Sequence, residues 1–254
     1  MKVNPVLSII IPVLNEEKSL PILLKDLENC KRHVTFPIEC IIVDGGSVDR
    51  SEEICRENGV SVVQAPRGRG QQLAAGADVA CGDVLLFLHA DSRLTAQHCV
   101  TAVALAKNGQ IVAGGFKLKF DDTHPILRLA EQINEIRFWC TKIFYGDHGI
   151  FLRRDKYEAV GGMPPQSLFE DIAFSKRLKR QGKTIMTAPP LVTSARRFRE
   201  GGVVRTYLKM ASLHILHWLG TSPNHLAKLY QNDAPMLEVS ENQEFDSAAI
   251  KESS

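Results

Sequence analysis

Short, almost wholly apolar runs alternate with helix-like stretches in the first third of the chain, and this alternation restricts the possible folds more than any other feature. Four such runs, at residues 6–13, 38–43, 60–64 and 84–88, are rich in Val, Ile and Leu, as strands covered on both faces are. The stretch at about 16–30 places leucines at helical spacing. Apolar strands that alternate with helices are typical of βαβ units. The sequence therefore predicts an α/β fold with a mostly parallel central sheet flanked by helices.

The pattern becomes mixed after residue 110. Residues 111–120 end in an alternation of apolar and polar side chains, which suits an antiparallel or edge strand. A strand at 184–187 is expected to stop at Pro189 and Pro190, because proline lacks the backbone donor of a sheet ladder. The remaining predicted elements are helices at about 126–144, 168–181, 202–219 and 224–230 and a strand at 150–153. From residue 234 the chain is polar and acidic without periodicity, so 234–254 is predicted to be a disordered tail.

Bulk composition narrows the class of protein. Apolar residues make up 44% and charged residues 24% of the chain, as in ordinary globular proteins. The net charge of +2 gives no general case for nucleic acid as a partner. No run reaches the roughly 18 apolar residues that indicate a membrane span. The six cysteines are scattered, form no CxxC pair and follow no recognisable signal peptide, so we expect reduced thiols and a cytoplasmic protein.

Polar residues follow three of the predicted strands directly. Asn15–Glu16 follow the first run, Asp44–Gly45 the second, and His89–Asp91 the fourth. Because ligands of open parallel sheets bind beyond the carboxyl ends of the strands, we expect these groups to meet at one ligand-binding edge. Asp91 suits a hard divalent cation, which prefers oxygen ligands. The alternative is that Asp91 caps a helix that starts near Thr95.

A basic, glycine-rich loop leads into the helix that is predicted at residues 71–81. It contains Arg67 and Arg69, each followed by glycine, and Gln71 comes directly after it. Two guanidinium groups on such a loop are suited to a phosphate or ribose contact. The loop matches neither the P-loop nor the GxGxxG pattern, so a solvated surface loop is an equal alternative.

Three ordered segments carry a family resemblance. They are Ile9–Glu17 (IIIPVLNEE), Ile42–Asp49 (IVDGGSVD) and Leu86–Ser92 (LFLHADS). In order and spacing they resemble the family 2 glycosyltransferases, and the resemblance continues to about residue 230. It implies a GT-A fold, with one domain over 1–233 that has a nucleotide-binding half at about 1–95 and an acceptor half at about 96–233. The chain also looks like a compact, soluble bacterial subgroup, some members of which are associated by name with arsenosugar biosynthesis.

The resemblance implies nucleotide contacts at the strand ends. Asp44, with Gly45 beside it, would contact the nucleobase. Pro12, Asn15 and Glu16 would line the nucleotide pocket, and the basic loop would approach the phosphates or the ribose.

The resemblance also implies a metal. His89-Ala90-Asp91 aligns with the DxD motif of such enzymes, with His89 in place of the first aspartate. Asp91 keeps the carboxylate that, together with the donor diphosphate, would hold Mg²⁺ or Mn²⁺ next to Ala90. His89 either forms a wall of the site, which we favour, or offers a nitrogen ligand to Mn²⁺.

A second acidic block resembles the pair that supplies the catalytic base in inverting members. Glu170 and Asp171 stand at the predicted start of a helix. An acceptor hydroxyl must lose its proton as it attacks the sugar, and a carboxylate can accept that proton. The family position assigns the base to Asp171 and a supporting contact to Glu170. The alternative is an acidic helix start stabilised by the helix dipole.

Two further segments are candidates for acceptor or diphosphate contacts. Asp147 and His148 lie between two glycines and would line the acceptor side, although a tight turn alone explains the glycines. Arg196 and Arg197 lie near the position of the Q/RxxRW motif of processive family members, but the tryptophan is absent. These arginines would meet the diphosphate or an anionic acceptor, and solvation at the surface is the alternative.

The predicted function is metal-assisted single displacement from a nucleotide-diphosphate sugar, UDP-linked by resemblance, to an unknown small-molecule or lipid acceptor. A non-catalytic nucleotide-sugar-binding protein is one alternative. A sugar-phosphate nucleotidyltransferase is disfavoured, since no glycine-rich loop follows the first strand. The helix at about 203–219 aligns Val204, Leu208, Ala211, Ile215 and Trp218 in one stripe. We expect this stripe to pack under the sheet or against a second subunit of a homodimer, with peripheral contact at the inner face of the membrane as the alternative.

Overall fold

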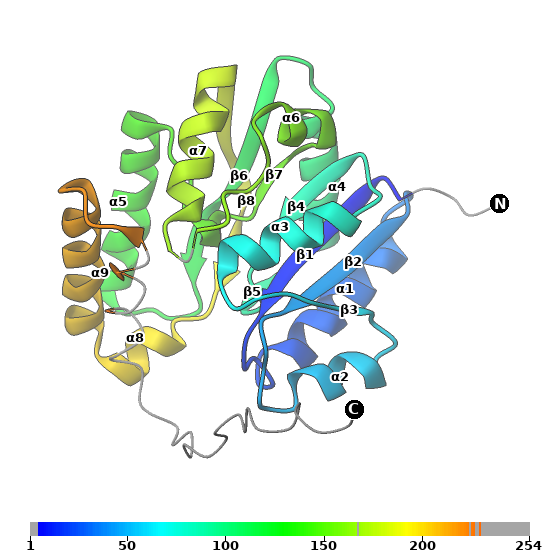
Figure 1. Ribbon diagram of the computed structural model, residues 1–254, viewed down its shortest axis with the longest axis horizontal. Helices are drawn as coiled ribbons and strands as arrows, with labels where there is room; N and C mark the ends of the chain where they lie inside the picture. Colours follow the sequence, from blue (N-terminus) through cyan, green and yellow to red (C-terminus); the bar gives the residue numbers. More distant parts are fainter. Residues whose placement is uncertain (1–4, 167, 224, 227–228, 230–254) are drawn as a thin grey trace, which may run out of the picture.

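The computed structural model describes residues 5–166, 168–223, 225–226 and 229, and its centre is an eight-stranded mixed sheet (Figure 1). The strand order is β3-β2-β1-β4-β7-β6-β8-β5. One half is parallel and contains β1 (Leu7–Val13), β2 (Ile38–Asp44), β3 (Val62–Gln64) and β4 (Val84–Phe87). The other half contains β5 (Ser92–Arg93), β6 (Ile111–Phe120), β7 (Ile150–Arg153) and β8 (Lys183–Thr193). Strand β7 joins the halves by antiparallel pairing with both β4 and β6.

Helices cover both faces of the parallel half, which explains why its strands are mostly apolar. Ile9 and Ile11 of β1 face a cluster that includes side chains of α1 (Leu20–His33) and α4 (Ala96–Ala106). Ile10 points to the opposite face, as the two-residue period of a strand requires. There it packs in a cluster with side chains of α3 (Arg69–Val79), α6 (Arg154–Ala159) and α7 (Glu170–Gln181). The short helix α2 (Ser51–Glu57) lies beside α1 at the edge of the sheet (Figure 1).

Three further helices lie at the β6–β8 end of the molecule. Helix α5 (Pro125–Thr141) and helix α9 (Val203–Trp218) lie side by side there, and α8 (Arg196–Gly201) leads into α9 (Figure 1). The one-turn 3₁₀ helix η1 (Gly146–His148) connects α5 to β7. No helix in the described part of the chain is long and apolar enough to cross a membrane.

The structure corrects two predictions about the second half of the sheet. Residues 111–120 pair antiparallel with β7, as one predicted alternative had it, but they form no edge strand, because β6 lies between β7 and β8 and pairs in parallel with β8. Strand β8 does not stop at Pro189 and Pro190 but continues to Thr193. The register with β6 shifts at this point, from Phe116 opposite Thr187 to Leu118 opposite Leu191. The prolines therefore occupy an irregularity of the ladder, where a missing donor is tolerated.

The structure also corrects the predicted role of the apolar stripe on α9. Val204, Leu208 and Trp218 are 56%, 67% and 84% exposed, so this stripe does not pack under the sheet. The buried side of α9 carries Leu213, which packs beside Ile143. Elements α6, α8, β5 and η1 were not predicted. The predicted helix at 224–230 falls mostly, and the predicted tail at 234–254 wholly, outside the described residues.

Candidate active site

The carboxyl ends of β1 and β2 are tied together by side chains that the sequence placed at this edge. Asn15, in the left-handed region at φ 55°, accepts from the Val48 amide through Oδ1 at 2.8 Å. Its own amide donates to the Ser47 hydroxyl at 2.9 Å. Asp44 is buried and accepts from the amides of Gly46 and Ser47 at 2.9 and 3.0 Å. Asn15 and Asp44 therefore meet at one edge, as predicted, and both order its turns.

A glutamine that sequence reasoning missed completes this edge. The Gln72 amide is buried and donates to the carbonyls of Val13 and Val43, both at 2.8 Å. Gly45 packs against it so closely that an added Cβ would lie 2.9 Å from Gln72 Cδ. The predicted Gln71 is its neighbour on α3 and makes neither of these contacts. Only the fold could single out Gln72, because its partners are backbone atoms of distant strands.

Asp91 lies where the segment after β1 and the start of α8, which are distant in sequence, come together. Burial raises the pKa of Asp91, Arg197 opposes that shift, and Glu16 and Arg196 also act on it. The Thr193 hydroxyl donates to Asp91 at a long 3.4 Å. Glu16 forms an ion pair with Arg196 at 3.2 Å. The residues at 16, 91, 196 and 197 therefore share one electrostatic environment, as the prediction of a common site requires.

Two alternatives from the sequence, Asp91 as a helix cap and the basic loop as a solvated surface loop, are wrong. Helix α4 is capped by Thr95 and His98 in a reciprocal capping box, so Asp91 does not cap it. The basic loop is not simply a solvated surface feature, because Arg69 is the first residue of α3 and its side chain is only 30% exposed. Arg67 does lie exposed.

Arg69 is the centre of the most concentrated charge cluster in the site. Its Nε donates to buried Glu170 and its Nη2 donates to Asp171 at 2.9 Å. Its Nη1 lies 3.0 Å from His89 Nε2. The guanidinium packs on Gly146, where an added Cβ would lie 2.8 Å from it. The structure thus joins the basic loop, the altered DxD motif and the acidic pair through one side chain.

These contacts determine the state of His89. Burial and the charges of Arg69 and Arg197 hold the pKa of His89 well below its ordinary value, so the ring is neutral. A guanidinium can only donate, so Nε2 of His89 accepts and the proton resides on Nδ1. With Nε2 engaged by Arg69, that nitrogen is not free for a metal in this arrangement, and the role of His89 as a wall of the site stays a prediction.

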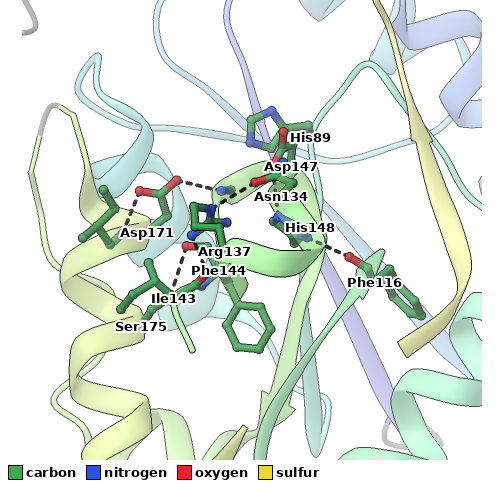
Figure 2. A network of polar contacts seen from close by, with 12 residues as sticks. His89, Phe116, Asn134, Arg137, Ile143, Phe144, Asp147, His148, Asp171 and Ser175 are labelled. Atoms are coloured by element: carbon green, nitrogen blue, oxygen red, sulfur yellow. Dashed lines mark hydrogen bonds and ion pairs between the residues drawn. The ribbon is translucent and has the colours of Figure 1, made fainter. Parts of the chain in front are cut away.

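Asp171 has both of its oxygens engaged. Oδ2 accepts from Arg69 and from the Gly146 amide at 2.7 Å, while Oδ1 accepts from the Ile172 amide at 2.7 Å. Glu170 and Asp171 are the first residues of α7, so the helix dipole also favours their charges. The Gly146 contact connects α7 to η1, the turn that holds Asp147 and His148 (Figure 2).

Two buried polar atoms of this turn have no hydrogen-bond partner. His148 is fully buried, and its Nδ1 lies 2.8 Å from the Phe116 carbonyl, while Nε2 is unpartnered. Asp147 Oδ1 is also unpartnered and lies 3.9 Å from His148 Nε2. Burial lowers the pKa of His148, so the ring is neutral and the two form no ion pair. Orphaned buried acceptors and rings are typical of sites that bind ligands.

Arg137 of α5 is a second site residue that sequence reasoning missed. In the view of Figure 2 it lies between Asp171 and His148. Its guanidinium stacks on the Tyr145 ring at 3.5 Å and donates to the Ile143 carbonyl at 2.9 Å. Its Nη2 is buried without a partner. An arginine on an amphipathic helix gives no sequence signal for such a position, because most point to solvent.

The residues around Asp91 fit a divalent cation that a ligand completes. Within the described ranges no group of three His, Cys, Asp or Glu side chains could hold a metal alone. Asp91 nevertheless offers a carboxylate whose hydrogen bond from Thr193 is long, and hard cations prefer such oxygens and retain outside ligands.

Comparison with known proteins identifies the family. The profile described as "Glycosyl transferase family 2" matches residues 8–161. The chain belongs to glycosyltransferase family 2. It is 32% identical over 164 residues to undecaprenyl-phosphate 4-deoxy-4-formamido-L-arabinose transferase of Yersinia enterocolitica, covering 61% of this chain and 50% of that protein. It is 37% identical over 105 residues to 4,4'-diaponeurosporenoate glycosyltransferase of Staphylococcus haemolyticus, covering 38% and 27%. The chain spans about half the length or less of these relatives.

Solved structures show the same GT-A fold at low sequence identity. TarS of S. aureus aligns with a TM-score of 0.60 and 17% identity over 87% of this chain and 68% of that one. The mannosyltransferase PcManGT of Pyrobaculum calidifontis, solved with GDP-Man and Mn²⁺, aligns with a TM-score of 0.59 and 19% identity over 90% and 70%. The expected fold is therefore confirmed, and residues 8–161 belong to a family 2 glycosyltransferase domain.

Proposed function

We propose that this glycosyltransferase transfers a sugar from a nucleotide-diphosphate donor, UDP-linked by preference, to an acceptor hydroxyl with inversion. The observation that carries the proposal is the convergence of Arg69, Glu170 and Asp171 beside the DxD-like segment. A carboxylate base, a cation for leaving phosphate and a metal-suited Asp91 are the groups that a single displacement needs. Structures of similar fold contain UDP-GlcNAc or GDP-Man, which supports a nucleotide sugar as donor.

The donor would occupy the edge formed by the ends of β1, β2 and β4. Pro12, Asn15 and Glu16 at the end of β1, with Asp44 and Gly45 at the end of β2, would surround the nucleoside. Arg69 and the pair Arg196–Arg197 offer the positive charge that a diphosphate requires. Asp91 would hold Mg²⁺ or Mn²⁺, which, when bound, would stabilise the negative charge of the leaving diphosphate.

The chemical step would be carried by Asp171. The acceptor oxygen attacks the anomeric carbon, its proton passes to Asp171, and the bond from that carbon to the diphosphate oxygen breaks. Asp171 is ion-paired with Arg69 in this structure. Donor phosphate oxygens would compete for the same guanidinium, so donor binding would leave Oδ2 with the Gly146 amide as its remaining donor and open its other lone pair to the proton. Glu170 is 1% exposed and remains a supporting contact.

The acceptor side is the region of α5, η1 and α9. Arg137, Asp147 and His148 present unpartnered polar atoms there. The relative from Yersinia is named for undecaprenyl phosphate, which supports a lipid acceptor and peripheral membrane contact for this chain as well.

The test is turnover of UDP-sugars with Mn²⁺ by the Asp171→Asn variant, combined with calorimetry of UDP binding. We expect turnover to fall by at least about a hundredfold, with UDP affinity not weakened, because the substitution removes a competitor for Arg69. Asp155→Asn, a change of the same chemistry at an exposed position of α6, is the matched control and should retain activity. Near-normal turnover of Asp171→Asn would refute the base assignment.

The ion pair also leaves a non-catalytic nucleotide-sugar-binding protein as a second candidate. Asp171 engaged by Arg69 is a poor base as long as that pair persists. Tight UDP binding without metal dependence, and with neither hydrolysis nor transfer of any donor, would favour this candidate over the enzyme.

A further inference from the structure

The solvent side of α9 is an apolar surface. Besides Val204, Leu208 and Trp218, Ile215 is 58% exposed, and Leu219 directly follows the helix at 67%. These positions recur every three or four residues, so they form one stripe along the helix. Its opposite side is already used, because Leu213 is buried in the cluster that contains Ile143. The exposed stripe is therefore surplus to the packing of the fold.

The neighbouring helix α5 has a second stripe of the same kind. Leu129, Ile133, Ile136 and Trp139 are all about half exposed or more, again at helical spacing. Monomeric proteins scatter single apolar side chains over their surface but rarely align them in this way. We call the exposed side chains of these two helices the α5–α9 face.

The two helices run in the same direction. Ala130, in the first half of α5, clusters with Val203 at the start of α9, whereas Ile143, just beyond the end of α5, clusters with Leu213 in the second half of α9. Trp139 and Trp218 stand near the carboxyl ends of their helices and therefore lie at the same end of the α5–α9 face. Tryptophan is the side chain most enriched where a protein meets the boundary of lipid and water.

The charge of this region favours an anionic surface as the partner. Residues 201–232 contain no Asp or Glu, while α9 carries Arg205 and Lys209. Lys142, at the end of α5, places its ammonium 4.3 Å from the Trp139 ring. Basic side chains beside an amphipathic apolar stripe are the pattern of helices that lie in the interface of an anionic bilayer.

A second copy of the chain fits the same surface less well. A two-fold interface places the same patch of both copies in contact. Helix α9 of the other copy would offer Arg205 no acidic residue. The acidic residues of α5 are already paired, Glu131 with Arg128 and Glu135 with Lys117. Like charges without acidic partners oppose such a dimer.

We propose that the α5–α9 face docks on an anionic lipid bilayer and holds the active site next to it. The inner side of α9 contacts the site, because the His214 ring lies 5.1 Å from Tyr145 and 5.0 Å from Phe169, which directly precedes the acidic pair. The docking itself is argued from the exposed side chains alone. The further statement, that docking brings a lipid acceptor to Asp171, rests on the proposed function as well.

The tryptophans make the test direct, because Trp139 and Trp218 are the only two in the chain. The full-length protein is mixed with vesicles of phosphatidylcholine with or without phosphatidylglycerol, and co-sedimentation and tryptophan emission are measured. We expect binding and a blue shift of the emission with the anionic vesicles, and weaker binding as salt is added. Leu208→Ser and Ile215→Ser should each weaken the partition coefficient by about tenfold. Arg205→Gln should weaken it by about fivefold on anionic vesicles only.

The matched control is Ile22→Ser, which removes an apolar side chain of 49% exposure from α1 and should bind vesicles like the unaltered protein. Absence of vesicle binding by protein that still binds UDP would overturn the docking proposal and leave the proposed function intact. A dimer in light scattering that Ile215→Ser dissociates would assign the face to a second copy and overturn it. So would tryptophans that acrylamide cannot quench in the lipid-free monomer, since the carboxyl-terminal segment would then cover the face.

Discussion

Replacing Arg69 by methionine removes the one cation that the structure places on two adjacent carboxylates. Glu170 is 1% exposed and the Asp171 side chain 10%, and Arg69 is ion-paired with both. Methionine keeps most of the packing volume of the arginine stem but no charge. The variant therefore tests whether this cluster stabilises the fold through charge neutralisation.

The expected loss follows from the burial of the partners. Removing one member of a buried ion pair costs about 3–5 kcal/mol, because the remaining charge is left uncompensated. Since the Arg69 side chain is 30% exposed, water screens part of this, and the lower end of about 3 kcal/mol applies. For a chain of this length such a loss lowers the Tm by about 6–12 °C.

The loss should depend on pH in a defined direction. Burial raises the pKa of Glu170, Arg69 opposes that shift, and Asp171 adds to it. Without Arg69 the pKa of Glu170 rises further, so the folded variant binds a proton that the unfolded chain releases. When the pKa of a carboxyl is higher in the folded state than in the unfolded state, the free energy of unfolding falls as the pH rises from the unfolded pKa to the folded pKa. The deficit of Arg69→Met should therefore be smaller at about pH 5 than at about pH 8.

The assay is thermal unfolding at both pH values with two comparison variants. Arg67→Met changes an exposed arginine of the same loop and should alter stability by no more than about 0.5 kcal/mol. Adding Glu170→Gln to Arg69→Met should restore part of the Tm at the higher pH, because it removes one of the uncompensated charges. If Arg69→Met and Arg67→Met have the same Tm at about pH 8, the cluster does not stabilise the fold and the reasoning fails.

Three more predictions address neighbouring groups. Burial raises the pKa of Asp91, so UDP binding measured by calorimetry with Mn²⁺ should weaken as the pH falls toward that raised pKa. Asp91→Asn should abolish both the metal dependence and this pH dependence of UDP binding. A metal effect that survives in Asp91→Asn would exclude Asp91 as the metal ligand. Nitrogen chemical shifts of His89 should report a neutral ring protonated at Nδ1 near neutral pH, and a protonated Nε2 would contradict its contact with Arg69. Gly70→Ala places a Cβ 2.3 Å from the Pro164 carbonyl oxygen and should destabilise the protein by at least about 2 kcal/mol in denaturant unfolding. Gly109→Ala, where a Cβ meets nothing within 4 Å, should not, and equal losses would refute the argument.

The parallel half of the sheet could be predicted from the sequence because its signals are local. The strands from β1 to β4 are mostly apolar, and the polar residues that follow must lie at one edge once the strands are parallel. The path of β8 through Pro189 could not be predicted in the same way. The register shift that accommodates the prolines is a property of its pairing with β6, about seventy residues earlier.

The two faces of α9 show a second limit of sequence patterns. The stripe containing Leu208 and Ile215 and the side containing Leu213 are both apolar. Periodicity identifies such faces, but only the position of α5 and η1 decides which one is buried. Of the partners that the sequence prediction offered for this stripe, the structure excludes the sheet, and an aligned row of exposed apolar side chains is typical of an interaction surface.

Arg69 joins three roles that the sequence assigned separately: phosphate contact, the wall at His89 and the base at Asp171. Asp171 lies 102 residues and His89 20 residues from Arg69 in the chain, so no local motif contains the cluster. If the proposed function holds, this arrangement implies an order of binding. An acceptor that arrives alone meets a base paired with a cation, whereas a donor diphosphate offers that cation a competing anion of higher charge. Donor would therefore bind first, and Arg69 would couple occupancy of the donor site to the release of Asp171.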